Sequence, residues 1–303
     1  MTSSPPPDAA GYAAAPSPVT TFIARGAIEH VDTGAGPVFL ALHGGMGGYD
    51  QSWLLARALL PDLGAYRVLA LSRPGYLGTA LAVGDTPERQ ADAYAALLDA
   101  LAIERAWVAA VSAGGPSALH FALRHPRRCA GLILVSTATG RLPVDPRIAR
   151  RMRAMGVLAR IPGVPGLLRR KAERDPRAAA ARAIPDAQIA ERTLADPQAG
   201  PLLRALQRGV LERLAARLPG TRHDTRQLRT LPDIPFERLE VPAFLVHGTA
   251  DRVVPFTHAA AVAERAPRAT LLKLHGGEHV ALFTHLHDIR AALAQFLAAG
   301  RAD

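Results

Sequence analysis

A serine at the end of a short apolar run has neighbours that suit a nucleophile. Ser112 follows the run 106–111, with Ala110 two positions before it and Gly114 two positions after it. A serine held on a sharp turn between a strand and a helix needs small residues at these two positions. Position 110 carries alanine where the usual G-x-S-x-G pattern has glycine, and alanine is still small. We therefore predict that Ser112 attacks a carbonyl carbon.

An acid and a base follow this serine in a suitable order. A serine hydroxyl needs a base to take its proton, and the base needs a third group to orient it. Asp251 lies just after the apolar run 241–247, and His279 lies just after the run 269–274. We predict that both act with the serine. Asp145 is the competing acid, although its place beside a proline is more typical of the residue that caps a helix.

Backbone N–H groups that could hold the oxyanion of a tetrahedral intermediate are expected at two places. The apolar run 37–42 leads into 43–48, a loop of one histidine, four glycines and one methionine. Small residues leave the N–H groups of such a loop accessible. We predict Gly45 as one donor and Ala113, at the N-terminus of the next helix, as the other. His43 is interpreted as a structural residue of the loop.

Four side chains are candidates for the walls of a substrate pocket. Met46 and Trp53 belong to or follow the predicted oxyanion loop, whereas Met152 and Met155 come much later. These two methionines have the spacing of one helix face. Flexible methionine side chains suit a pocket that accepts varied apolar groups.

Together these motifs resemble those of the α/β-hydrolase fold family, in its single-domain form with a helical lid. Five segments carry the resemblance, over roughly residues 20 to 300; they are 43–45, 72–79, 110–114, 248–251 and 277–279. Ser72 departs from the family pattern, because relatives often have an aspartate before Arg-Pro-Gly. The resemblance implies a serine hydrolase that acts on a small ester or similar acyl compound and uses no cofactor.

Other activities remain open within the same machinery. Hydrolysis of a C–C bond in a diketone-like substrate is one alternative. Iminopeptidase-like amide hydrolysis is another, although Met46 replaces the expected proline and no pair of acids for an amine is evident. A ligand-binding protein that keeps the three residues without turnover is a third. Serine at position 112 excludes the nucleophilic aspartate of dehalogenases and epoxide hydrolases.

Strand-like and helix-like segments alternate along most of the chain. After an opening hairpin at 20–32, strands are predicted at 37–42, 67–71, 106–111, 131–136, 241–247 and 269–274. Helices are predicted at 51–60, 86–102, 114–124 and 286–299. This alternation predicts an α/β fold, with a mostly parallel central sheet and helices on both faces. The predicted core comprises 20–140 and 236–303, with a helical lid at 141–235 and a disordered Pro/Ala-rich tail at 1–19.

The positive charge of the chain is concentrated in one region. The formal net charge is +10, and residues 141–240 contain 21 Arg and Lys against 11 Asp and Glu. The remainder of the chain is therefore balanced. A solvated basic surface is the preferred interpretation, and attraction of anionic substrates or a membrane surface are alternatives. No aromatic residues alternate with these arginines, so nucleic acid is not an expected partner.

The remaining features of composition limit the class of protein. The single cysteine, Cys129, rules out an internal disulfide and favours a reducing compartment, so we expect a cytoplasmic protein. No apolar run reaches the roughly 18 residues of a membrane helix. His275, His279, His285 and His287 lack the spacing of a known metal motif, so no metal is expected. The sequence does not indicate an oligomeric state.

Overall fold

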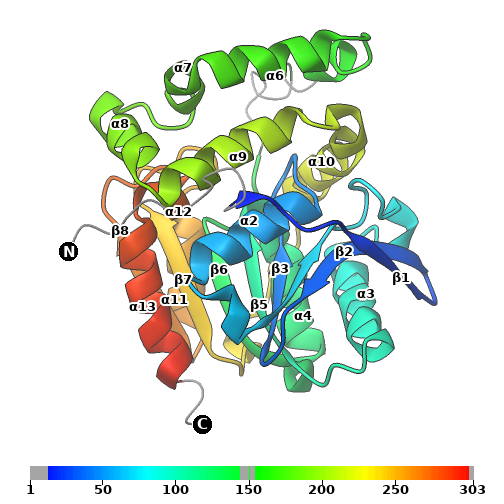
Figure 1. The fold of residues 1–303 in the computed structure, drawn as a ribbon. Coiled ribbons are helices and arrows are strands. Elements are labelled where there is room, and N and C mark those ends of the chain that lie inside the picture. The colour runs from blue at the N-terminus through cyan, green and yellow to red at the C-terminus, as the bar shows by residue number, and fades with distance from the viewer. Residues whose placement is uncertain (1–12, 144–149, 151–153, 300–303) are drawn as a thin grey trace.

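An eight-stranded sheet forms the centre of the computed structural model, which describes residues 13–143, 150 and 154–299 (Figure 1). The strand order is β1-β2-β4-β3-β5-β6-β7-β8. Strands β1 and β2 are antiparallel to their neighbours, and the pairs from β4 through β8 are parallel. The strands are β1 (Val19–Ile23), β2 (Gly26–Thr33), β3 (Val38–Leu42), β4 (Arg67–Leu71), β5 (Ala106–Val111), β6 (Cys129–Val135), β7 (Ala243–Gly248) and β8 (Ala269–Leu274). The predicted fold class is confirmed.

Alternating side chains of the central strands pack into two separate apolar layers. In β3, Leu40 and Leu42 belong to one layer, whereas Phe39 and Ala41 belong to the other. Because successive residues of a strand point to opposite faces, a strand buried on both faces is apolar throughout. The core helices are α2 (Tyr49–Leu59), α3 (Pro87–Ala100), α4 (Gly115–Arg124), α11 (Thr257–Arg265), α12 (Ala281–Thr284) and α13 (Leu286–Ala299). The four helices predicted for the core are thus confirmed.

The described end of the N-terminal segment is ordered. Ala13 is buried among apolar residues of the core, and Val19 begins the first strand. The prediction of disorder over 1–19 is therefore wrong for 13–19, because proline and alanine can pack on apolar surface without regular secondary structure. Residues 1–12 lie outside the described part of the chain.

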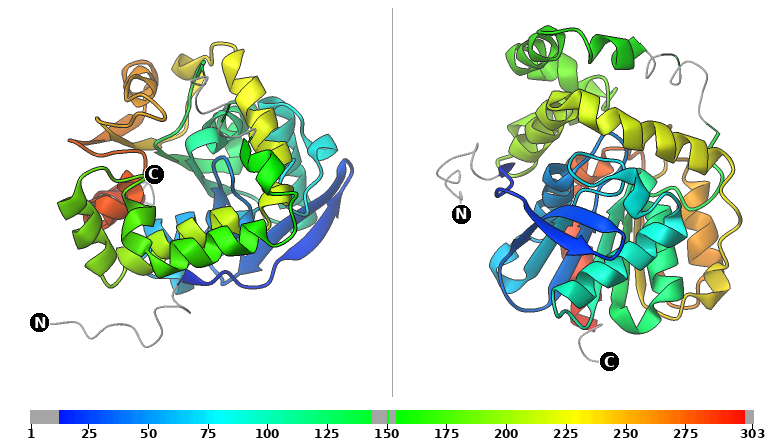
Figure 2. Two further views of the ribbon diagram at one scale, coloured as in Figure 1. Left: turned by 90° about the horizontal axis from the view of Figure 1, so that it is seen from above. Right: turned by 90° about the vertical axis from the view of Figure 1, so that its right-hand side faces the viewer.

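A helical insertion separates β6 from β7. Its described helices are α6 (Val164–Arg174), α7 (Pro176–Ala180), α8 (Ala187–Ala195), α9 (Ala199–Leu211) and α10 (Leu214–Arg229). They cover one end of the sheet, with α9 and α10 nearest to the core and α6 outermost (Figures 1 and 2). Among the described helices, none is both long and apolar enough to cross a membrane.

Two ion pairs fix α10 of this insertion to the core. Arg73, which is 1% exposed, pairs with Asp224 of α10, and the hydroxyl of Tyr76 donates to the same carboxylate at 2.6 Å. Arg217, also 1% exposed, donates to Asp50 of α2 at 2.7 and 3.0 Å. Breaking a buried pair leaves an uncompensated charge, which is costly. The α10 part of the insertion is therefore a fixed part of the molecule.

Candidate active site

Ser112 lies on a strained turn between β5 and α4. Its φ is 53°, a left-handed conformation that is rare for a residue with a side chain. Neighbouring atoms approach so closely that glycine is needed at two positions. A Cβ at Gly114 would lie 2.8 Å from the carbonyl oxygen of His43, and one at Gly44 would lie 2.9 Å from the Cβ of Ser112. This turn presents the Ser112 hydroxyl at the end of the sheet.

The structure brings Ser112, His279 and Asp251 into one chain of hydrogen bonds. His279 Nδ1 lies 2.8 Å from Asp251 Oδ2, and its Nε2 lies 3.1 Å from Ser112 Oγ. A carboxylate only accepts, so Nδ1 must carry the proton. Nε2 is then free to accept the Ser112 proton. The three residues come from loops after β5, β7 and β8, which end at the same edge of the sheet.

Asp251 is held as a carboxylate by several donors. Burial by itself raises the pKa of Asp251, but hydrogen bonds from His247 and His279 outweigh burial and hold that pKa well below its ordinary value. The backbone N–H groups of Val253 and Val254 donate to Oδ1 at 2.8 and 2.9 Å. The group that orients His279 therefore keeps its negative charge at neutral pH.

The two predicted oxyanion donors lie in the loop after β3 and directly after Ser112. Neither the N–H of Gly45 nor that of Ala113 has a hydrogen-bond acceptor among the described residues. Both groups are thus available to a ligand. His43 is fully buried; its Nε2 accepts from the backbone N–H of Arg73 at 2.9 Å, and its Nδ1 donates to the Gly44 carbonyl at 2.6 Å. The structural role predicted for His43 agrees with these bonds.

The backbone of Met46, next to Gly45, is hydrogen-bonded to both α10 and α2. Met46 has a φ of 60°. Its N–H donates to Thr221 Oγ1 on α10, and its carbonyl accepts from Gln51 Nε2 on α2, both at 2.9 Å. Thr221 in turn donates its hydroxyl proton to the Arg217 carbonyl at 2.9 Å. The helical insertion and the core thus hold the Gly45–Met46 segment together.

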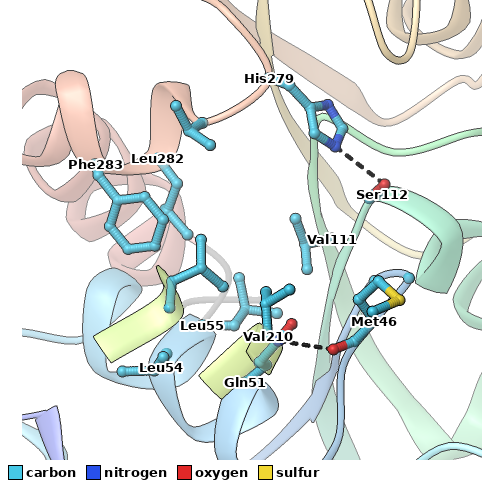
Figure 3. Close-up of a pocket in the computed structure, with 14 residues that line it drawn as sticks. Met46, Gln51, Leu54, Leu55, Val111, Ser112, Val210, His279, Leu282 and Phe283 are labelled. Carbon is cyan, nitrogen blue, oxygen red and sulfur yellow. Dashed lines mark hydrogen bonds between the residues drawn. The ribbon is translucent and has the colours of Figure 1, made fainter. Parts of the chain in front are cut away.

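A cavity of about 300 Å³ opens beside Ser112 (Figure 3). Its walls are formed by the loop after β3, the helices α2 and α9, and the segment that follows His279. Apart from Ser112, His279 and Gln51, the side chains are apolar. The described residues that line it are Gly44, Gly45, Met46, Gln51, Leu54, Leu55, Val111, Ser112, Leu206, Val210, His279, Val280, Leu282 and Phe283. A cavity of this size and character suits a small apolar group.

Of the four predicted pocket residues, only Met46 is among the described residues that line the cavity. Trp53 is buried in the core instead, because Gln51 and Leu54 share the helix face of α2 that meets the cavity and Trp53 is turned away from it. Met155 is half-buried but does not reach the cavity, since the adjoining residue 156 packs against α10. Met152 lies outside the described residues.

Residues of α9, which were not predicted from the sequence, line the cavity where the two methionines were expected. Leu206 and Val210 line the cavity from one face of this helix. Leu203, Leu206 and Val210 are three and four residues apart, which is the spacing of one helix face and could have indicated this role. His247 was also missed; its Nε2 donates to the Val254 carbonyl at 2.9 Å and lies 3.4 Å from Asp251 Oδ2.

Three further features bear on alternatives to this site. Asp145, the competing acid, lies outside the described residues. No group of three or more potential metal ligands occurs among the residues that the structure describes. Burial raises the pKa of the Cys129 thiol to about 12, which makes this cysteine a poor nucleophile.

The chain belongs to the alpha/beta hydrolase fold family, whose sequence profile matches residues 37–286. A solved structure of an alpha/beta hydrolase fold protein from Nakamurella multipartita is 30% identical, with a TM-score of 0.82, and the match covers 94% of this chain and all of that one. The 2-hydroxymuconate semialdehyde hydrolase of Pseudomonas sp. (strain CF600) is 26% identical over 88% of this chain and 89% of its own length.

Other curated relatives match only a part of the chain. The 2-hydroxy-6-oxo-6-phenylhexa-2,4-dienoate hydrolase of Comamonas testosteroni is 35% identical over 36% of this chain and 39% of its own length. The chain spans only 39–41% of the length of several such relatives. These likenesses indicate a hydrolase but do not identify its substrate.

Proposed function

We propose that this protein is a serine hydrolase that cleaves esters of small, uncharged, apolar acyl groups through an acyl-enzyme. The proposal rests on the position of the Ser112 hydroxyl. It lies 3.1 Å from His279 Nε2, at the wall of an apolar cavity. Hydrolysis then needs no group beyond those of the chain and a water molecule.

In the first half of the proposed reaction, Ser112 Oγ attacks the ester carbonyl while His279 Nε2 takes its proton. Asp251 stabilises the imidazolium that forms. The negative charge on the carbonyl oxygen is stabilised by the N–H groups of Gly45 and Ala113. Collapse of the intermediate expels the alcohol, which receives the proton from His279, and leaves the acyl group on Ser112.

In the second half, water attacks the acyl-enzyme. His279 takes a proton from the water, and the same two N–H groups stabilise the second oxyanion. Collapse breaks the bond to Ser112 Oγ, which regains its proton from His279. The acid leaves, and the enzyme returns to its starting state.

The preference for an uncharged acyl group follows from the side chains around the cavity. No Arg, Lys, Asp or Glu is among the described residues that line it. The nearby Arg73 and Arg217 are already paired with Asp224 and Asp50. A charged substrate group would therefore lose its hydration without gaining a partner, which is unfavourable.

Hydrolysis of a C–C bond is the second candidate, because the curated relatives named above include hydrolases of dienoate-type compounds. By its name, such a compound carries a carboxylate. The cavity described here offers that carboxylate no cation, and for this reason the ester is preferred. The same cavity offers no acid for the amine of an iminopeptidase substrate.

Turnover of p-nitrophenyl butyrate compared with 2-hydroxy-6-oxo-6-phenylhexa-2,4-dienoate tests the proposal. We expect kcat/KM for the ester to exceed that for the dienoate by at least about 100-fold, the cost of burying one unpaired charge being several kcal/mol. A higher value for the dienoate would favour C–C hydrolysis. No turnover of either, with tight binding of an ester analogue, would indicate a binding protein.

Thr221 is expected to influence catalysis through the oxyanion loop. Thr221→Val removes the acceptor of the Met46 N–H and frees the neighbouring Gly45. Loss of one oxyanion donor costs about 10²–10³ in kcat, so we expect a decrease up to that size with little change in KM. Thr221→Ser keeps the hydroxyl and is the matched control, which should retain nearly all of kcat. Equal losses in both variants would contradict this role.

Acyl-chain preference is expected to depend on α9 rather than on Met155. Val210→Phe fills part of the cavity, so the optimal p-nitrophenyl ester should become shorter by about two carbons. Met155→Ala is the control, because Met155 does not line the cavity. A chain-length profile changed by Met155→Ala and unchanged by Val210→Phe would show that the cavity is not the acyl site.

A further inference from the structure

Apolar side chains are exposed to an unusual extent in one short stretch of the insertion. Seven large apolar residues are exposed in the described part of the chain, and four of them lie within 157–167. These four, exposed by 38–65%, are Val157, Leu158, Ile161 and Leu167. Hydrogen bonds from the N–H of Ile161 to the Leu158 carbonyl, and of Val164 to the Ile161 carbonyl, hold the stretch in a compact turn before α6.

Exposed basic side chains lie in the same stretch of the chain as these apolar residues. On α6, Leu167, Arg170, Lys171 and Arg174 have the spacing of one helix face and are all exposed. Arg160 is exposed in the preceding turn. None of these four cations has an ion-pair partner among the described residues. We call the four apolar and these four basic residues the outer patch.

The outer patch is well placed to meet a large partner. The opposite side of α6 packs on α9, so α6 is the layer of the insertion farthest from the sheet (Figures 1 and 2). Residues 154–174 contain five Arg and Lys against one Glu. Exposed apolar side chains with free cations beside them are typical of segments that lie at the surface of a lipid bilayer. There the apolar groups enter the acyl boundary, and the long basic side chains reach the headgroups.

We propose that the outer patch docks this protein on an anionic lipid surface. Charge complementarity decides between this partner and a second copy of the chain. A symmetric dimer through the outer patch would bring its cations against those of the partner, which is unfavourable. An anionic bilayer attracts each of them by about 1 kcal/mol, or about fivefold in binding. The patch is separate from the cavity beside Ser112, so docking does not depend on the proposed function.

Sedimentation with lipid vesicles tests the proposal. The full chain is mixed with vesicles of phosphatidylcholine alone or with one third phosphatidylglycerol. We expect binding only to the anionic vesicles, weakening as salt increases. Arg170→Glu/Lys171→Glu should weaken this binding at least about 25-fold, since two attractive charges are lost. Ile161→Ser/Leu167→Ser should weaken it at least about tenfold through the loss of buried apolar area.

A matched control distinguishes the effect of the outer patch on vesicle binding from the effect of the protein's net charge. Arg105→Glu/Arg127→Glu makes the same change in charge before β5 and β6, at the opposite end of the sheet, and should bind as the unmodified protein does. Circular dichroism and thermal melting confirm that each variant is folded, independently of any activity. Absence of vesicle binding, equal binding to both lipids, or equal weakening in the control would overturn the proposal. So would a dimer that Ile161→Ser/Leu167→Ser dissociates while vesicles remain unbound.

Discussion

Replacement of Ser112 by alanine is expected to lower kcat for a p-nitrophenyl ester by on the order of 10⁶. Without Oγ no acyl-enzyme can form, although the cavity and the two N–H groups remain. KM should change little, because the substrate still binds. Stopped or continuous absorbance assays at high enzyme concentration measure the residual rate.

Ser136→Ala provides the control for this change. Ser136 is a buried serine that, like Ser112, has a positive φ and follows a strand, and its Oγ has no hydrogen-bond partner among the described residues. Its replacement should leave kcat within a few fold of the original. A Ser112→Ala variant that retained more than about a hundredth of the activity would exclude the proposed nucleophile.

Asp251→Asn is expected to lower kcat by about 10³–10⁴. An asparagine amide can offer an N–H to His279 Nδ1, which favours the tautomer with a proton on Nε2. That tautomer cannot accept the proton of Ser112. The loss should appear in kcat rather than KM, and labelling of Ser112 by a reactive phosphonate should slow in parallel.

The Asp145→Asn variant tests whether Asp145, rather than Asp251, is the acid that acts with His279. Asp145 follows another strand of the same sheet and is the alternative that the sequence leaves open. We expect its replacement to change kcat by less than about twofold. A large loss in Asp145→Asn with a small loss in Asp251→Asn would reverse the assignment.

The proximity of the three candidate catalytic residues could be predicted because strand ends determine where they lie. Ser112, Asp251 and His279 each follow an apolar run, and parallel strands bring their carboxyl ends to one edge. The small residues around Ser112 reflect a turn that leaves no space for larger ones. Such local constraints are visible in a single sequence.

The walls of the cavity and the anchoring of the insertion could not be predicted in the same way. Trp53 and Gln51 are two residues apart, yet only the rotation of α2 decides which of them meets the cavity. The pairing of Arg73 with Asp224 joins residues 151 positions apart, and many other arginines could have met that acid. These features depend on how helices pack, which spacing alone does not specify.

Mass spectrometry after reaction with a fluorophosphonate tests directly whether Ser112 is the nucleophile. We expect one adduct per chain, on the peptide that contains Ser112, and no adduct in the Ser112→Ala variant. Asp251→Asn should form the same adduct more slowly. An adduct on another residue, or labelling that persists in Ser112→Ala, would contradict the assignment of Ser112 as the nucleophile.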